Sequence, residues 1–99
     1  MTWSAAEVVA LRHRLGLDRK GLAQLLAVEP RTVVRWERNE AVPTGSAEAV
    51  LFALKETLDR HPARAERTVR FVTEAARVGG LGYLLIKLLD AALDQRERS

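Results

Sequence analysis

Pro30 most constrains the fold of this chain, because it divides a stretch of helical pattern, residues 18–39, into two short helices. Proline lacks an N–H and its φ is already helical, so it is favoured in the first turn of a helix. It also pushes the preceding residue, Glu29, out of the α region. The sequence therefore predicts a helix over residues 19–26, a turn of about three residues and a second helix that begins at Pro30.

Each of these helices has one apolar face. Asp18 is a good N-cap for the first helix. Its apolar positions recur at the spacing of one helical face and are Leu22, Leu25 and Leu26. In the second helix Val33 and Trp36 face inward. The outward positions of that helix are Arg31, Val34, Arg35 and Arg38. The second helix is therefore predicted to have one core face and one basic face.

Two helices joined by so short a turn, the second with arginines outward, form the helix-turn-helix arrangement that places a recognition helix in the DNA major groove. The net charge of +3 is weak evidence for nucleic acid, but residues 11–38 hold seven basic and three acidic residues. Arg31 and Arg35 could each bond a guanine edge, and Val34 could meet a thymine methyl group. The alternatives are a solvated charged face and a passive surface valine. Trp36 could stack on a base, but its register with Val33 predicts a core residue.

The rest of the chain is also helical in pattern, with no strand-like alternation. A capping box of Ser4 and Glu7 begins a first helix, and Gly16 is predicted to end it as a left-handed C-cap. Further helices are predicted over residues 47–60, 63–78 and 82–96. Phe52 lies off the apolar stripe of its helix and needs a second partner surface. The inward positions of the helix over residues 63–78 are Val69, Val72 and Ala76. The predicted fold class is all-α, with five or six helices.

Several function classes have no support in the sequence. The N-terminus has no basic segment followed by an apolar run, and the longest uncharged run, residues 78–86, is too short to span a bilayer. There is no cysteine, and His13 and His61 without clustered carboxylates do not make a metal site. No catalytic constellation and no glycine-rich phosphate loop is present. We expect a cytoplasmic protein that is not an enzyme, with no membrane association, metal, cofactor or small-molecule ligand.

The motif resembles the helix-turn-helix repressors of the phage Cro and repressor type, also called the xenobiotic-response-element family. The likeness covers residues 4–58 and rests on the run RTVVRWE followed by a short loop. It implies a lambda-repressor-like fold in which an arginine of the first helix pairs with a glutamate late in the recognition helix. Those positions match Arg12 and Glu37, and a small residue in the motif's first helix matches Ala23. The stretch AVPTGSAEAVLFALKETL is also similar to part of the anti-CRISPR-associated regulators.

The resemblance also implies which side chains touch DNA. The base-contacting positions are Glu29, Pro30, Arg31 and Arg35. The phosphate-contacting positions are Arg19, Arg38, Thr44 and Ser46. Two positions depart from the family pattern. Ala27 stands where the turn commonly has glycine, at a cost of about 1 kcal/mol if the residue is left-handed. Glu29 stands where serine, threonine or glutamine is usual, and phosphates repel its carboxylate unless it accepts from cytosine or pairs with Arg31.

Residues 62–99 are predicted to form a helical pair that extends the DNA-binding module of residues 1–61. The last helix is apolar over more than one face, which favours a homodimer. The candidate interface residues are Leu81, Leu84, Leu85 and Leu88. A dimer could hold two recognition helices about 34 Å apart to read a palindromic operator. The expectation is a homodimeric, sequence-specific transcriptional regulator, a repressor of phage or mobile-element type. The alternatives are an antitoxin whose C-terminal helices bind a toxin, and a protein-interaction module without DNA binding.

Overall fold

The computed structural model describes residues 3–79, and within them the chain forms α-helices and one short 3-10 helix, with no strand. The all-α prediction is therefore confirmed for this part of the chain. The elements in order are α1 (Ala5–Arg14), α2 (Arg19–Leu26), α3 (Pro30–Glu37), α4 (Gly45–Arg60), η1 (Pro62–Arg64) and α5 (Ala65–Val78). The predicted dimer-interface residues Leu81, Leu84, Leu85 and Leu88 lie outside the described residues.

Local features define both ends of α1, a pair of hydrogen bonds at its start and a left-handed glycine after its end. Ser4 Oγ accepts from the N–H of Glu7 (3.1 Å), and Glu7 Oε1 accepts from the N–H of Ser4 (3.0 Å). This reciprocal capping box satisfies two donors that the first turn of a helix leaves unpaired. At the other end Gly16 has a φ of +68°, so the predicted left-handed residue is confirmed. The chain can therefore turn sharply from α1 towards α2.

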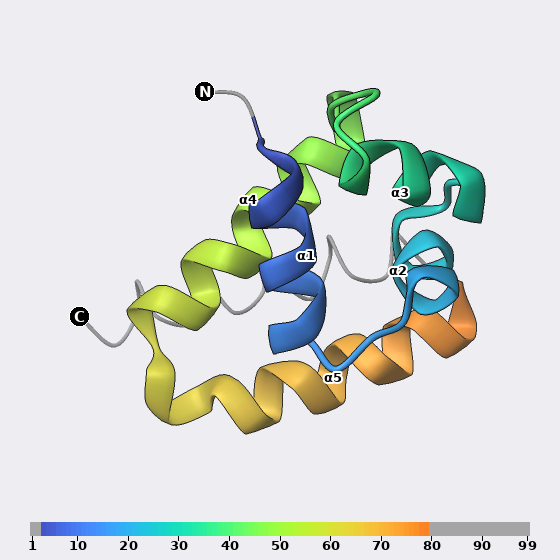
Figure 1. Ribbon diagram of the computed structural model, residues 1–99. Coiled ribbons are helices and arrows are strands. Elements are labelled where there is room, and N and C mark those ends of the chain that lie inside the picture. Colours follow the sequence, from blue (N-terminus) through green and yellow to red (C-terminus); the bar gives the residue numbers. More distant parts are fainter. Residues whose placement is uncertain (1–2, 80–99) are drawn as a thin grey trace.

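One apolar core includes residues from all five α-helices that the structure describes. The helix α2 packs against both α3 and α5. In Figure 1, α5 runs along the lower side of the molecule, and its C-terminal end lies beside α2. The described part of the predicted C-terminal region thus shares its core with residues 1–61.

The buried face of α5 lies slightly to one side of the predicted stripe. Val72 and Ala76 are buried as predicted, but Val69 is only partly buried, and Ala75 is fully buried beside Ala76. The distance between packed helices depends on the side chains at their contact. Two adjacent alanines therefore allow α5 to lie close to its neighbours.

Candidate nucleic-acid interface

The start of α2 and the start of α3 both follow the sequence prediction. Asp18 caps α2, since its carboxylate accepts a hydrogen bond from the N–H of Gly21 (2.6 Å). Glu29 has an extended backbone (φ −75°, ψ 147°), and α3 begins at Pro30. The connection itself is residues 27–29. The short turn holds the start of α3 close to the end of α2.

Ala27 makes this turn in a conformation that alanine seldom adopts. Its φ of 57° and ψ of 42° are left-handed. The turn is closed by a hydrogen bond from the N–H of Val28 to the carbonyl of Ala23 (3.0 Å). A left-handed residue with a Cβ costs roughly 1–2 kcal/mol relative to the ordinary helical region. Ala27 is therefore strained, at a position where the family that this sequence resembles commonly has glycine.

The inner face of α3 belongs to the core. Val33 is completely buried and Trp36 is 4% exposed. The prediction that Trp36 is a core residue is confirmed, and its ring is not available for stacking on a base. A large aromatic ring that is fully packed fixes the orientation of the helix about its axis. The opposite face of α3 therefore points to solvent.

Three exposed arginines share the outer side of α3. Arg31 and Arg35 lie in the helix, Arg38 is its C-cap residue, and the three positions span an arc of about 60° at 100° per residue. None of their side chains makes a hydrogen bond or ion pair with another residue in the range 3–79. Val34 lies at the edge of this arc and is half-buried. Guanidinium groups in this position are free to bond an external acceptor.

Arginines elsewhere in the molecule mostly have carboxylate partners. Ion pairs on the surface join Arg14 to Asp59 (2.9 Å) and Arg60 to Glu56 (2.9 Å). There are two exceptions, Arg64 of η1 and Arg67 of α5, whose side chains have no partner within the described residues. The arginines on the outer face of α3 differ because they are neighbours on one short helix.

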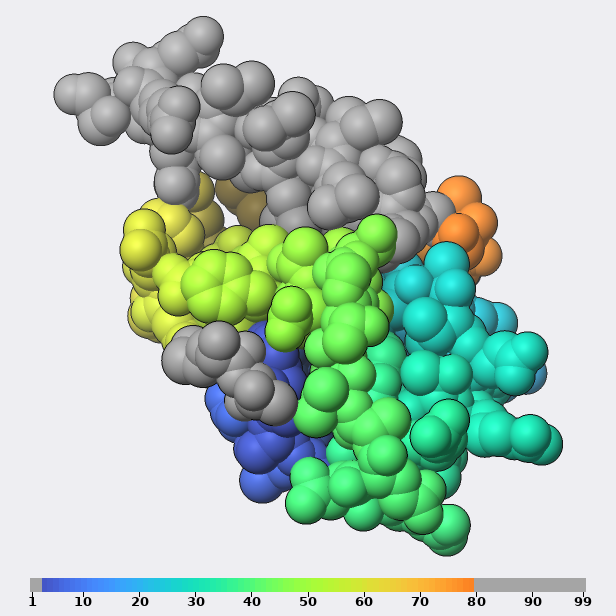
Figure 2. Space-filling view, turned by 90° about the horizontal axis from the view of Figure 1, so that it is seen from above, coloured from blue at the N-terminus to red at the C-terminus, as the bar shows by residue number. Residues whose placement is uncertain are grey.

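The other predicted DNA-contacting residues also lie at the surface. Glu29 and Pro30 are exposed at the start of α3. Thr44 is the N-cap residue of α4, but its side chain makes no capping hydrogen bond, and Ser46 is exposed in the first turn. Figure 2 shows the atoms of α3 and of the segment after it (teal to green) beside one another, with teal side chains projecting from the edge of the molecule.

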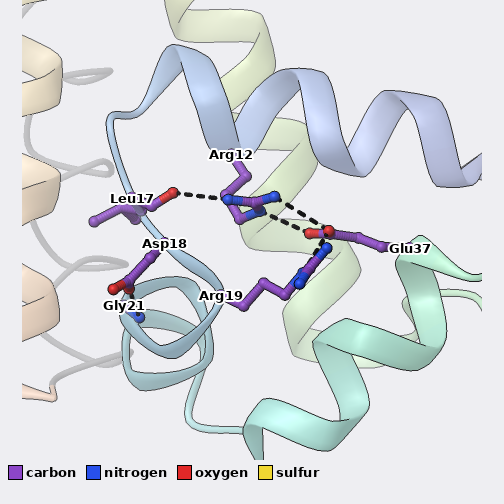
Figure 3. A network of polar contacts seen from close by, with 6 residues as sticks. All are labelled: Arg12, Leu17, Asp18, Arg19, Gly21 and Glu37. Atoms are coloured by element: carbon purple, nitrogen blue, oxygen red, sulfur yellow. Dashed lines mark hydrogen bonds and ion pairs between the residues drawn. The ribbon is translucent and has the colours of Figure 1, made fainter.

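Behind this face, Glu37 holds the end of α3 against α1 (Figure 3). Arg12 donates to it twice, from Nε to Oε2 (2.7 Å) and from Nη2 to Oε1 (3.2 Å). Arg12 Nη1 also donates to the carbonyl of Leu17 (3.2 Å). The side chains of Arg12 and Glu37 are 12% and 3% exposed. The predicted structural ion pair is therefore confirmed.

Glu37 has a second partner, which was not predicted from the sequence. Arg19 Nε donates to Glu37 Oε1 (2.9 Å), although the Arg19 side chain is 56% exposed. The two Nη groups of Arg19 make no hydrogen bond within residues 3–79. Glu37 therefore holds the Nε side of the Arg19 guanidinium, and the two Nη groups remain available for the predicted phosphate contact. The two residues are 18 positions apart, and no local pattern signals this contact.

The environment of Glu37 keeps its carboxylate charged. Burial is the largest influence and raises its pKa, but the hydrogen bonds and charges of Arg12 and Arg19 outweigh burial, so the pKa lies below the ordinary 4.5. Glu37 is the only acidic residue of α3. Because its charge is turned inward and bonded to two arginines, the outer face of the helix remains positive.

Within the range 3–79 there is no group of three metal-ligating side chains, and no helix has the length and apolar character needed to cross a membrane. Comparison of the chain with protein-family models, with curated proteins and with solved structures finds no match. Within residues 3–79 the chain is all-helical, and the outer side of α3 carries exposed arginines.

Proposed function

We propose that this chain is a sequence-specific DNA-binding protein that acts as a homodimeric transcriptional repressor of phage or mobile-element type in the cytoplasm. The observation that supports the proposal best is the outer face of α3, where Arg31, Arg35 and Arg38 are exposed and have no partner among the described residues. The family resemblance of residues 4–58 supports the same function. A rigid helix with one positive face matches the shape and charge of the major groove.

In this proposal α2 and α3 form a helix-turn-helix, and α3 is the recognition helix. Arg31 and Arg35 each donate two hydrogen bonds to a guanine edge, and each such pair is worth about 1–3 kcal/mol of discrimination. Val34 meets a thymine methyl group. Glu29 and Pro30 approach the bases from the start of the helix, where Glu29 accepts from a cytosine amino group. These contacts provide sequence preference.

Contacts to the phosphates provide affinity and orientation. Arg38, Thr44 and Ser46 extend from α3 to the start of α4 and are all exposed. Arg19 offers its two Nη groups from the start of α2, while Glu37 holds its Nε. Contacts of this kind position a protein on the duplex without reading bases. The Arg12–Glu37 pair makes no contact with DNA in this proposal and only keeps α3 in place.

Two copies of the chain would read the two halves of a palindromic operator. In this arrangement the recognition helices lie about 34 Å apart, one turn of the duplex. Repression then follows because a dimer on an operator that overlaps a promoter excludes the transcription machinery. The proposed contacts between the copies, through Leu81, Leu84, Leu85 and Leu88, lie outside the described residues.

Selection of bound sites from random DNA, followed by gel shifts with variants, tests the proposal. Arg31→Ala and Arg35→Ala should fold normally and lose preference at particular base pairs, by about 5- to 150-fold at each. Arg38→Ala should weaken binding to all sequences and reduce the slope of log affinity against log salt by about one. The matched control is Arg67→Ala, which removes an exposed arginine of α5 that has no partner within residues 3–79.

Two outcomes would contradict the proposal. If no DNA is enriched and the chain's own upstream DNA is not retarded, DNA binding is absent and an interaction module is the better explanation. If Arg67→Ala weakens binding as much as Arg31→Ala, only general charge is involved and α3 is not a recognition helix. Selected sites with two inverted half-sites would support the dimer, and single half-sites would contradict it.

A further inference from the structure

A groove of about 370 Å³ lies between the start of α1 and the outer face of α4. Its apolar lining includes Trp3, Ala49 and Phe52. Phe52 is 48% exposed, whereas Trp3 is buried. The groove residues of α4 recur from Gly45 to Glu56 on successive turns, a stripe about 16 Å long at 1.5 Å per residue. The prediction that Phe52 needs a second partner surface therefore remains open, because no described residue covers it.

The polar lining of this groove is predominantly acidic. Three carboxylates and one ammonium group line it, from Glu7, Glu48, Glu56 and Lys55. Two of these groups are already in ion pairs, the Lys55 ammonium with Asp59 Oδ2 (3.0 Å) and the Glu56 carboxylate with Arg60 Nε (2.9 Å). Glu48 has no partner in residues 3–79. The groove thus has the opposite charge to the outer face of α3, on a chain whose net charge is positive.

These charges exclude several occupants. DNA and anionic lipid surfaces carry negative charge and are repelled by the carboxylates. A purely apolar ligand would fill the aromatic lining but leave the carboxylates of Glu7 and Glu48, which have no ion-pair partner within residues 3–79, without a counter-charge. A helix with one apolar face and flanking lysines or arginines satisfies both features, because their long stems cover apolar surface while their charged ends reach the rim. Amphipathic helices commonly bind grooves of this kind.

We propose that the groove lined by Trp3, Phe52 and Glu48 is a docking site for a basic amphipathic helix of a partner protein. Phe52 is the apolar anchor of this site, and Glu48 attracts the flanking cations. The site uses side chains other than those of the proposed DNA-binding function, because α3 contributes no residue to it. Gly45 in its lining lies between Thr44 and Ser46, two of the proposed phosphate-contacting residues, so the two sites adjoin at the start of α4.

Calorimetry with the full chain and two synthetic peptides tests this proposal. One peptide is built of leucine and lysine with its leucines on one helical face, and in the other every lysine is replaced by glutamate. The lysine peptide should bind and shift the NMR signal of the Trp3 indole, and the glutamate peptide should not bind. Phe52→Ser and Glu48→Lys should each weaken binding about tenfold or more.

Two matched variants control for general effects. Val78→Ser removes an exposed apolar side chain from α5, and Glu66→Lys makes the same charge change as Glu48→Lys but on α5. Both should bind the lysine peptide as the unaltered chain does. Equal binding of both peptides, no binding of either, or an effect of Glu66→Lys as large as that of Glu48→Lys overturns the proposal. Self-association of the chain that Phe52→Ser abolishes would assign the groove to a second copy and overturn it too.

Discussion

Replacing Glu37 by alanine should destabilise the fold strongly, because its carboxylate is almost wholly buried against Arg12. The guanidinium of Arg12 would then lie between α1 and α3 without its main counter-charge. Breaking a buried ion pair from one side costs about 3–5 kcal/mol. The lost bond to Arg19 adds no more than about 1 kcal/mol, since that arginine is mostly in solvent. Small domains are stable by only about 5–15 kcal/mol, so this one change removes a large part of the total.

Urea unfolding followed by circular dichroism measures this loss. Arg19→Ala is the matched control and should cost about 1 kcal/mol or less. A double variant with methionine at positions 12 and 37 removes both charges and keeps most of the volume, so it should lose less stability than Glu37→Ala alone. Equal losses in the free energy of unfolding for Glu37→Ala and Arg19→Ala would refute this reasoning. They would mean that the buried Arg12–Glu37 pair contributes no more to stability than the exposed bond to Arg19.

Three further predictions concern stability. Ala27→Gly should raise the free energy of unfolding by about 0.5–1 kcal/mol, because glycine is unstrained at this left-handed and exposed position; a urea midpoint that falls would contradict this. Leu54→Ala should cost about 2–5 kcal/mol in the same assay, since Leu54 is wholly buried in the core. The stabilisation from the lowered pKa of Glu37 is complete above about pH 4.5 and is lost as the pH falls through the folded value. Thermal melts should therefore show a smaller loss of stability on acidification in Glu37→Ala than in the unaltered chain.

The features that the sequence predicted well are those that depend on neighbouring residues. The capping box of Ser4 and Glu7 and the start of α3 at Pro30 are local and appear as expected. The left-handed conformation of Ala27 was considered only because the resembled family commonly has glycine there, and the structure shows it. Periodicity also placed Trp36 in the core, because one side of an amphipathic helix must be buried. The resemblance provided the long-range pair of Arg12 and Glu37, which periodicity does not provide.

The features that sequence reasoning missed depend on how distant elements pack. The bond between Arg19 and Glu37 requires α2 and α3 to be in place first. The packing of α5 on α2 was not predicted, because an amphipathic stripe shows which face is buried but not against which neighbour. The acidic lining of the groove beside Phe52 was also missed, since its members come from α1 and α4 and gather only in the folded chain.

The position of α5 against α2 determines what can be transplanted from this molecule. A fragment that stops at residue 61 would lack the buried side chains of Val72, Ala75 and Ala76, and water would reach the surface of α2 that α5 covers. A hybrid made by grafting the basic helix into another scaffold would therefore need to continue to at least residue 79. For the same reason, substitutions in α5 could tilt α2 and its attached helix and so change the chain's affinity for a ligand that α5 itself never meets.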